Sequence, residues 1–295
     1  MNRSYYEAPA RGRIDGLLDT GSFREWLPPA MRITSPHLAK LDLPGAFDDG
    51  VIIGRGQING QIIFIAAQEG GFMGGAVGEV HGAKIVGLLE RAKRERPNAV
   101  VLLFETGGVR LQEANAGLIA VSEIIRAMLA LRASGVPVLV AIGGQYGCFG
   151  GMGIAARCAT AIVMNEEGRL GLSGPEVIET ARGVEEFDSR DRALVWRTVG
   201  GKHRYLLHEC DFIVADAIDA FRDALAAAMK VGETWSMFTI EAEHAKLTDR
   251  LNHFGNCQDA GQIWQQLGWE DPESLAMLAT GDFIGAASVP GRRAN

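Results

Sequence analysis

The chain has 295 residues, 47% of them hydrophobic, which is enough to bury a large core. Its formal net charge is −7 and it contains no basic tract, so nucleic acid is not expected as a partner. The four cysteines form no CxxC pair, which excludes a zinc ribbon and disfavours a disulfide framework.

These features favour a cytoplasmic protein without a bound metal. The first residues, Met1 to Arg13, are polar and charged, unlike a signal peptide. The longest mostly apolar predicted helix, Leu118 to Leu131, carries Ser122, Glu123 and Arg126 and is too short and too polar to cross a membrane. We therefore expect no membrane association.

The first part of the chain predicts a helix, an irregular segment and a hairpin. Residues 8–27 are typical of a short amphipathic helix followed by a turn at Gly21-Ser22, and residues 28–48 are Pro-rich and irregular. The runs 51–55 and 61–67 are strand-like. Asn59-Gly60 between them favours a type I′ hairpin turn, which needs φ > 0 at both positions.

From residue 78 onward, predicted helices alternate with short apolar strands. The predicted elements are helix 78–96, strand 99–104, helix 111–133, strand 137–142, helix 149–157, strand 160–164, helices near 174–181 and 190–199, strand 212–214 and helix 217–230. Near-continuous apolar strands between helices indicate a parallel sheet covered on both faces. The basic stretch 91–96 ends a predicted helix and is interpreted as its solvated end.

The C-terminal residues differ from the rest. Residues 233–295 show helical and then irregular patterns without a strand signal. We therefore expect an α/β domain over residues 1–232 and a helical extension over 233–295 that is a candidate interface.

Two glycine-rich turns each follow one of the apolar strands. The first turn is Phe104 to Arg110 and the second is Gly147 to Gly153. Glycine allows φ > 0 and a close approach of the backbone, so two such turns can aim several N–H groups at one point. Backbone amides arranged in this way stabilise an oxyanion without a charged side chain.

The second turn also contains a weak dinucleotide signature. Gly151 to Ala156 matches GxGxxA after a strand, and Glu166 follows the next strand. However, the loop 143–148 intervenes between strand and motif, and the following helix is short for a crossover helix. The dinucleotide interpretation is therefore disfavoured.

Five ordered motifs within residues 8–225 resemble those of acyl-CoA carboxyltransferase subunits. They are Ala10 to Ile14 with Leu17 to Phe23, Phe72 to Gly82 (similar to FGGSxGxxxG), Thr106 to Glu113 (similar to SGGARxQE), Gly150-Gly151, and Gly174 to Glu179 (similar to GPRVIE). The resemblance implies the crotonase-like, or ClpP-like, β-β-α superhelix, an α/β fold.

Within that superfamily the chain is most similar to β subunits of biotin-independent malonate decarboxylases. No zinc ribbon precedes residue 8, and residues 144–151 read GQYGCFGG instead of the threonine-rich TTGG type. The tail beyond residue 233 has no recognised counterpart in bacterial acetyl-CoA carboxylases. These departures favour the decarboxylase branch over the carboxylase β subunit.

The resemblance implies both a reaction and partners. The reaction is decarboxylation of a malonyl thioester to an acetyl thioester and CO₂, with the acyl group on the CoA-derived, phosphopantetheine-type arm of an acyl-carrier subunit. One crotonase unit makes half of a site, so a homologous γ carboxyltransferase subunit is expected, and an ACP-transferase α subunit is a further possible partner. No cofactor is expected to be bound covalently to this chain.

The candidate catalytic residues are the amides of the two turns: Gly107, Gly108, Val109, Gly150 and Gly151. The alternative is that these glycines only permit tight turns between strand and helix. Candidate substrate-binding residues are Gly74, Gly75, Arg110, Cys148, Phe149, Ser173 and Gly174.

Each of these side chains also has a structural interpretation. Arg110 favours an ion pair with Glu113, and Gly74, Gly75 and Gly78 equally suit a close-packed turn. Ser173-Gly174-Pro175 is typical of a helix cap. His81 is a conceivable proton relay but fits a buried imidazole better, and Cys148 lacks a spaced His or acid for nucleophilic catalysis.

Three other functions compete with the decarboxylase. A biotin-dependent acyl-CoA carboxyltransferase subunit would carry the same motifs. A non-catalytic scaffold would keep the fold alone. A ClpP-type serine protease is disfavoured, because Ser173 has no helpful His or Asp nearby in the sequence.

Overall fold

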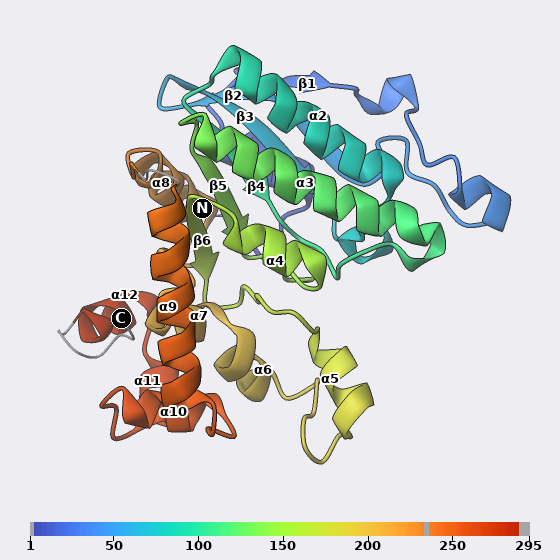
Figure 1. The fold of residues 1–295 in the computed structure, drawn as a ribbon. Coiled ribbons are helices and arrows are strands. Elements are labelled where there is room, and N and C mark those ends of the chain that lie inside the picture. The colour runs from blue at the N-terminus through green and yellow to red at the C-terminus, as the bar shows by residue number, and fades with distance from the viewer. Residues whose placement is uncertain (1–2, 233–235, 289–295) are drawn as a thin grey trace.

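A seven-stranded sheet forms the centre of the computed structural model, which describes residues 3–232 and 236–288 (Figure 1). The strands lie in chain order: β1 (Arg24–Trp26), β2 (Val51–Ile58), β3 (Gln61–Gln68), β4 (Ala99–Leu103), β5 (Val138–Ile142), β6 (Ala161–Asn165) and β7 (Phe212–Val214). Strands β3 to β7 are parallel, as predicted, but β1 to β3 pair antiparallel. The sheet is therefore mixed.

At the antiparallel end of the sheet, the predicted turns are confirmed and one strand was not predicted. Asn59 and Gly60 have φ of 51° and 74°, which confirms the hairpin turn between β2 and β3. Within residues 8–27, the predicted short helix is confirmed but ends at Leu17, where the chain becomes extended, and the predicted turn at Gly21-Ser22 is confirmed by the bond from the Ser22 amide to the Asp19 carbonyl. Residues 24–26 form the edge strand β1, whose Trp26 packs edge-on against Phe64 of β3 at 4.8 Å.

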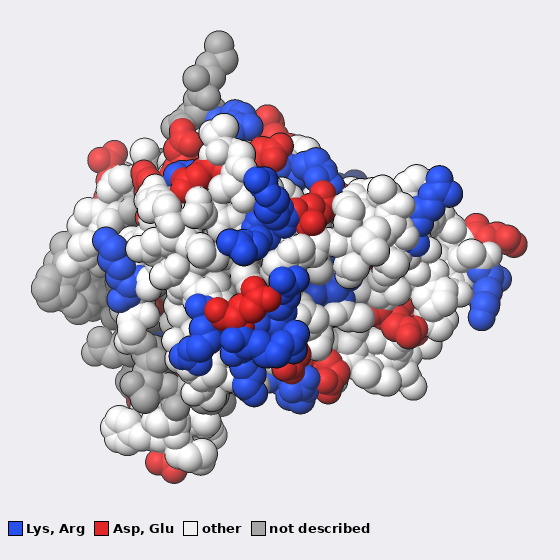
Figure 2. Space-filling model, turned by 90° about the horizontal axis from the view of Figure 1, so that it is seen from above, with Lys and Arg blue, Asp and Glu red and all other residues white. Residues whose placement is uncertain are grey.

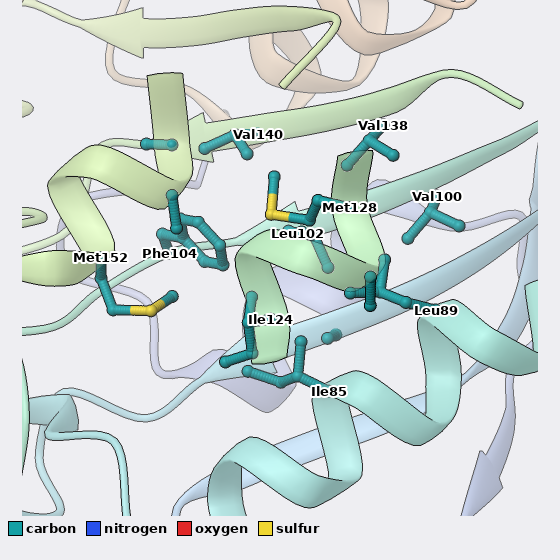
Figure 3. Close-up of a cluster of buried hydrophobic side chains, with 14 of the residues drawn as sticks. Ile85, Leu89, Val100, Leu102, Phe104, Ile124, Met128, Val138, Val140 and Met152 are labelled. Carbon is teal, nitrogen blue, oxygen red and sulfur yellow. The ribbon is translucent and has the colours of Figure 1, made fainter. Parts of the chain in front are cut away.

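Helices cover both faces of the sheet. One face is covered by α2 (Glu79–Glu95), α3 (Asn115–Ala133) and α4 (Gly151–Arg157), and the other by α1 (Ala10–Leu17) and α8 (Ile218–Ala228). Alternation along β4 places Val100 and Leu102 against α2 and α3 (Figure 3), whereas Val101 and Leu103 join the core under α1 and α8.

The predicted helix 111–133 begins later than expected. Residues Leu111–Glu113 form a 3₁₀ turn, and Ala114, with φ of 48° and ψ of −126°, separates that turn from α3. Other short 3₁₀ turns, at Pro29–Met31, Leu38–Leu41 and Met73–Gly75, interrupt the irregular segments. The break at Ala114 allows Glu113 to turn back into a buried ion pair, described below.

The helices after β6 extend beyond the sheet. They are α5 (Pro175–Arg182), α6 (Arg192–Val199), α7 (Gly201–Leu206), α9 (Met237–Phe254), α10 (Ala260–Gln266), α11 (Pro272–Met277) and α12 (Thr280–Ala287). The sequence did not indicate α7. The expectation of an irregular segment after a helical one is wrong up to residue 288, because α10 to α12 form a cluster around Trp264 and Phe283, and residues 289–295 lie outside the described residues. That cluster includes Leu206 of α7 and Ile213 of β7, so it is continuous with the sheet domain.

The predicted boundary between residues 232 and 233 adjoins residues 233–235, which lie outside the described residues. The division into two domains therefore stays a prediction. Lys202 connects the two parts, since its Nζ donates hydrogen bonds to the carbonyls of Ala276 and Leu278 at 2.7 Å each.

The surface carries both signs of charge. Viewed from above, Lys and Arg side chains gather near the middle of the face with Asp and Glu among them (Figure 2). At the C-terminal end of α2, Lys93 and Arg94 are exposed and Arg91 pairs with Glu95 at 2.6 Å, which confirms a solvated helix end. Among residues 3–232 and 236–288, no helix combines the length and apolarity needed to span a bilayer.

Candidate active site

The two glycine turns lie side by side where β4 and β5 end. The Phe149 amide donates to the Thr106 carbonyl at 3.0 Å, and Thr106 and Cys148 form a parallel bridge. A Cβ on Gly150 would lie only 3.3 Å from the Cα of Gly108. Glycine permits this approach, and Gly150 has φ of 63° and ψ of −145°, a conformation that side chains disfavour.

Most amides of the two turns are already bonded. The Gly107 amide donates to the Gly74 carbonyl at 2.9 Å, the Gly108 amide to Thr106 Oγ1 at 3.0 Å, and the Gly150 amide to the Leu172 carbonyl at 2.9 Å. Within the part of the chain that the structure describes, the amide of Val109 in the first turn and the amides of Gly151 and Met152 in the second have no acceptor. Each turn therefore keeps a donor available for a ligand.

Gly74 and Gly75 belong to a third segment that packs against the first turn. A Cβ on Gly75 would meet the Glu105 carbonyl oxygen at 1.8 Å, so no other residue fits without a shift of the backbone. Val77 and Val109 form a parallel bridge. The Val77 amide donates to the Gly108 carbonyl, and the Arg110 amide donates to the Val77 carbonyl, both at 2.9 Å. The segment therefore fixes the conformation of the first turn from behind.

Arg110 is fully buried in an ion-pair network. Its Nη1 lies 2.6 Å from Glu113, which confirms the predicted pair, and 3.0 Å from Asp49. Its Nη2 donates to the Ala76 carbonyl at 3.2 Å. Burial raises the pKa of the Asp49 carboxyl, and the Arg110 guanidinium opposes that rise. The charges of Asp49, Arg110 and Glu113 therefore depend on one another.

His81 is locked in the same region. Its ring nitrogens lie 3.0 Å from Gln68 Nε2 and 3.1 Å from the Asp49 carbonyl, and its side chain is fully buried. Burial, and then the charge of Arg110, lower its pKa to about 3, so the imidazole is neutral at pH 7. The interpretation as a buried histidine is confirmed.

An ion pair that the sequence did not reveal lies behind both turns. Arg13 of α1 pairs with Glu105, the residue after Phe104 at the end of β4, and both side chains are buried. Glu105 Oε1 also accepts from the Tyr146 amide at 3.3 Å, in the loop before the second turn. An arginine next to Ile14 on the buried face of α1 was the signal that could have indicated a partner in the core.

The remaining predicted binding residues differ in accessibility. Cys148 is fully buried, and burial raises the pKa of its thiol. Phe149 packs in a cluster with Phe187 and Val199, whereas Ser173 is exposed.

The start of α5 lies where the sequence predicted a helix cap. Pro175 and Glu176 lie in the first turn of α5, which confirms that Ser173-Gly174-Pro175 marks the start of a helix. The N-cap is Gly174, and it makes no side-chain bond. Among residues 3–232 and 236–288, no group of three or more His, Cys, Asp or Glu side chains is arranged to hold a metal ion.

The surface around the available amides is apolar and open to solvent. The exposed side chains are Leu111 at 80%, Leu118 at 56%, Ile119 at 61%, Ile154 at 53% and Leu172 at 69%. Large exposed apolar side chains are typical of a binding site or an interface when they lie together. Here they occur in the segments that follow the two turns and in Leu172, whose carbonyl accepts the Gly150 amide.

Comparisons with known proteins identify the family to which the chain belongs. The carboxyl transferase domain family matches residues 7–200. The malonyl-S-ACP:biotin-protein carboxyltransferase MADC of Malonomonas rubra is 42% identical over 311 residues, which cover 97% of this chain and 96% of the relative.

Solved structures show the same similarity. A chain of a Pseudomonas malonate decarboxylase hetero-tetramer in complex with malonate has a TM-score of 0.80 at 42% identity, over 88% of this chain and 95% of that chain. A chain of the Pseudomonas malonate decarboxylase MdcD-MdcE hetero-dimer has a TM-score of 0.67 at 39% identity, over 86% and 97%.

Proposed function

Because the chain belongs to the carboxyl transferase domain family, we propose that it is the subunit of a malonyl-thioester decarboxylase that stabilises the thioester enolate. The observation that carries the proposal is the pair of available amides, Val109 and Gly151, one in each of two touching turns. Donors that are fixed before the reaction stabilise charge as it develops on an oxygen.

The reaction needs this kind of support and little else from the chain. The bond between the carboxylate carbon and the α carbon breaks, its electron pair moves into the thioester enolate, and CO₂ leaves. Two amides hydrogen-bonded to the enolate oxygen lower the barrier, and the α carbon then takes up a proton. Loss of one such donor typically costs about 10²–10³ in kcat.

The other residues of the predicted site divide by burial. We assign Gly107, Gly108 and Gly150 to the shape of the turns, and Gly74, Gly75 and Arg110 to their support. Cys148 and Phe149 are buried and hold the second turn, so of the predicted binding set Ser173, with Gly174 beside it, is left to face a ligand.

The acyl group is proposed to arrive on the phosphopantetheine-type arm of an acyl-carrier subunit. The Malonomonas rubra relative supports this assignment, because its name specifies a malonyl-S-ACP substrate. A homologous γ subunit is proposed to cover the apolar surface around Leu111 and Ile119, in line with the hetero-dimer and hetero-tetramer of the Pseudomonas enzyme. An ACP-transferase α subunit would belong to the same assembly.

Transfer of the carboxyl group to biotin is the second candidate. The name of the Malonomonas rubra relative specifies a biotin protein as the acceptor, and that relative matches almost the whole chain. Both reactions break the same bond and pass through the same enolate. They differ only in whether the carboxyl group leaves as CO₂ or is captured.

The experiment uses the complex of this chain with its γ partner and a malonyl thioester labelled at the free carboxylate. Release of labelled CO₂ without added biotin is expected and supports the decarboxylase. Release or transfer of label only when a biotin acceptor is present would assign the transferase instead. No cleavage under either condition would leave the non-catalytic scaffold.

A further inference from the structure

The second glycine turn lies on residues 169–172, a segment that follows β6. The Cys148 amide donates to the Arg169 carbonyl at 2.8 Å, and the Gly150 amide donates to the Leu172 carbonyl at 2.9 Å. These bonds fix the turn at two points. The direction of the amides in the turn therefore depends on where residues 169–172 lie.

The residues just before α7 hold the same segment from its other side. Arg169 and Gly200 form an antiparallel bridge, and the Leu170 amide donates to the Val199 carbonyl at 2.9 Å. Val199 also packs with Phe149 of the second turn in one apolar cluster. A shift at the start of α7 would therefore reach the second turn both through backbone bonds and through this packing.

Lys202, in the first turn of α7, is bonded to three acceptors. Its Nζ lies 2.7 Å from Glu166 Oε2 and donates to the carbonyls of Ala276 and Leu278 at 2.7 Å each. An ammonium group has three donors, so all of them are used. Glu166 directly follows β6, and the two carbonyls lie at the end of α11, where helix carbonyls lack partners within the helix. One side chain therefore joins the sheet, α7 and the C-terminal helices.

The first residues of α7 have little room to move. A Cβ on Gly201 would meet the Asn165 carbonyl oxygen at 2.1 Å, so the helix begins in close contact with the end of β6. Two residues later, His203 Nδ1 accepts a hydrogen bond from Trp264 Nε1 at 3.0 Å. Lys202 lies between these two contacts and is only 6% exposed. The start of α7 is thus fixed between β6 and the cluster formed by α10 to α12 (Figure 1).

The rigidity of this region bears on the Gly151 amide. Backbone donors stabilise an oxyanion only when they stay fixed as the charge develops. Loss of the Lys202 ammonium would leave Glu166 without its cation and two helix-end carbonyls without a donor. The start of α7 would then relax, and residues 169–172 would relax with it.

We propose that Lys202 is a positioning residue, through which the C-terminal helices hold the second glycine turn with its available amides in place. The part of the proposal that concerns the enolate rests on the proposed function. The part that concerns the conformation of the turn is independent of the reaction, because it depends only on the contacts between the turn, residues 169–172 and α7.

The first test measures hydrogen exchange of backbone amides in the complex with the γ partner, without substrate. The variant is Lys202→Met, and the matched control is Arg222→Met. Arg222 likewise pairs with a carboxylate, that of Asp19, and donates to a backbone carbonyl, that of Leu17. It does so beside the β2–β3 hairpin, at the opposite end of the sheet from the glycine turns.

The two variants should differ in both exchange and turnover. The amides of Cys148 and Gly150 should exchange faster in Lys202→Met than in the wild type, and at the wild-type rate in Arg222→Met. In a second test, turnover of a malonyl thioester per assembled complex, Lys202→Met should have a kcat about 10–100-fold lower with KM unchanged, because a misplaced donor is lost to the transition state. Arg222→Met should keep its kcat. A purely structural role would lower the thermal stability of both variants and the kcat of neither.

A milder variant covers the case in which Lys202→Met fails to assemble. Trp264→Phe loses the hydrogen bond to His203 but keeps an aromatic ring, and it should change both readouts in the same direction by less. With an active wild type, an assembled variant that changes in neither readout, or in only one of them, would overturn the proposal. If the wild-type complex does not cleave the thioester, faster exchange in the second turn would still support the positioning role while contradicting the proposed function.

Discussion

Replacing Gly151 by proline removes one proposed oxyanion donor while keeping the helix that follows. Gly151 is the first residue of α4, the position at which proline is tolerated because the amide has no intrahelical acceptor. Gly150 before it has ψ of −145°, outside the helical region that a following proline disfavours. The backbone can therefore accept the substitution.

The side-chain cost has to be separated from the loss of the donor. A Cβ at position 151 would lie 2.8 Å from Val121 Cγ1, so any residue larger than glycine forces a small shift there. Overpacking of this kind costs about 1–3 kcal/mol. Gly151→Ala meets the same contact but keeps the amide hydrogen, and it is the matched control.

The assay is CO₂ release from a malonyl thioester by the complex with its γ partner. Gly151→Pro is expected to have a kcat about 10²–10³ lower than Gly151→Ala, equivalent to about 2.7–4 kcal/mol in the barrier. Assembly of the complex is checked for both variants. Equal kcat values for two assembled variants would refute the assignment of the Gly151 amide to the oxyanion hole.

Three further predictions concern the supports of the site. Gly150→Ala should abolish most turnover, because a Cβ there meets the first turn. The control Gly60→Ala, at a φ of 74° with open space around it, should lower stability but not kcat. Equal turnover in both variants would contradict the close approach of the two glycine turns. Arg110→Met should lower the free energy of unfolding in urea by about 3–5 kcal/mol, because it leaves the buried carboxylates of Asp49 and Glu113 without their cation. A loss as small as that of Arg126→Met, at an exposed ion pair, would count against the network. Burial lowers the pKa of His81 from 6.5 to about 3, so between these pH values the unfolded chain binds a proton that the folded chain does not. The free energy of unfolding should therefore fall as the pH drops from 6.5 towards 3, by up to about 1.4 kcal/mol per pH unit. His81→Gln should flatten this slope, and parallel curves for wild type and variant would disprove the prediction.

The sequence predicted the parts of the fold that depend on local pattern. The apolar runs that became β4, β5 and β6 are buried on both faces, and such strands are recognisable without knowledge of their neighbours. The family match and the similarity to a solved structure confirm the predicted crotonase-like α/β fold. The edge strand β1 was missed because residues 24–26 gain their conformation from pairing with β2, which lies about 30 residues away.

The site shows the same limit. The two glycine turns could be found from their composition, but the identity of the available amides could not. The Thr106 hydroxyl accepts the Gly108 amide, and the bridge to Val77 leaves the Val109 amide without an acceptor. Neither contact can be read from the local sequence. Asp49 and Arg13 were missed as partners of Arg110 and Glu105, because the pairs are 61 and 92 residues apart and no local pattern connects them.

The charges that the chain buries near the turns point away from acid–base chemistry by this subunit. Arg110 is paired with Asp49 and Glu113, and Glu105 is paired with Arg13. His81 is neutral and hydrogen-bonded to fixed partners. Backbone donors give a large electrostatic effect only when they cannot relax away from the oxyanion, so rigid support behind the turns serves the same end as a catalytic side chain would. The open side of the turns is apolar, around Leu111 and Ile119. We therefore expect the proton for the enolate carbon to come from the side that the partner subunit or solvent occupies.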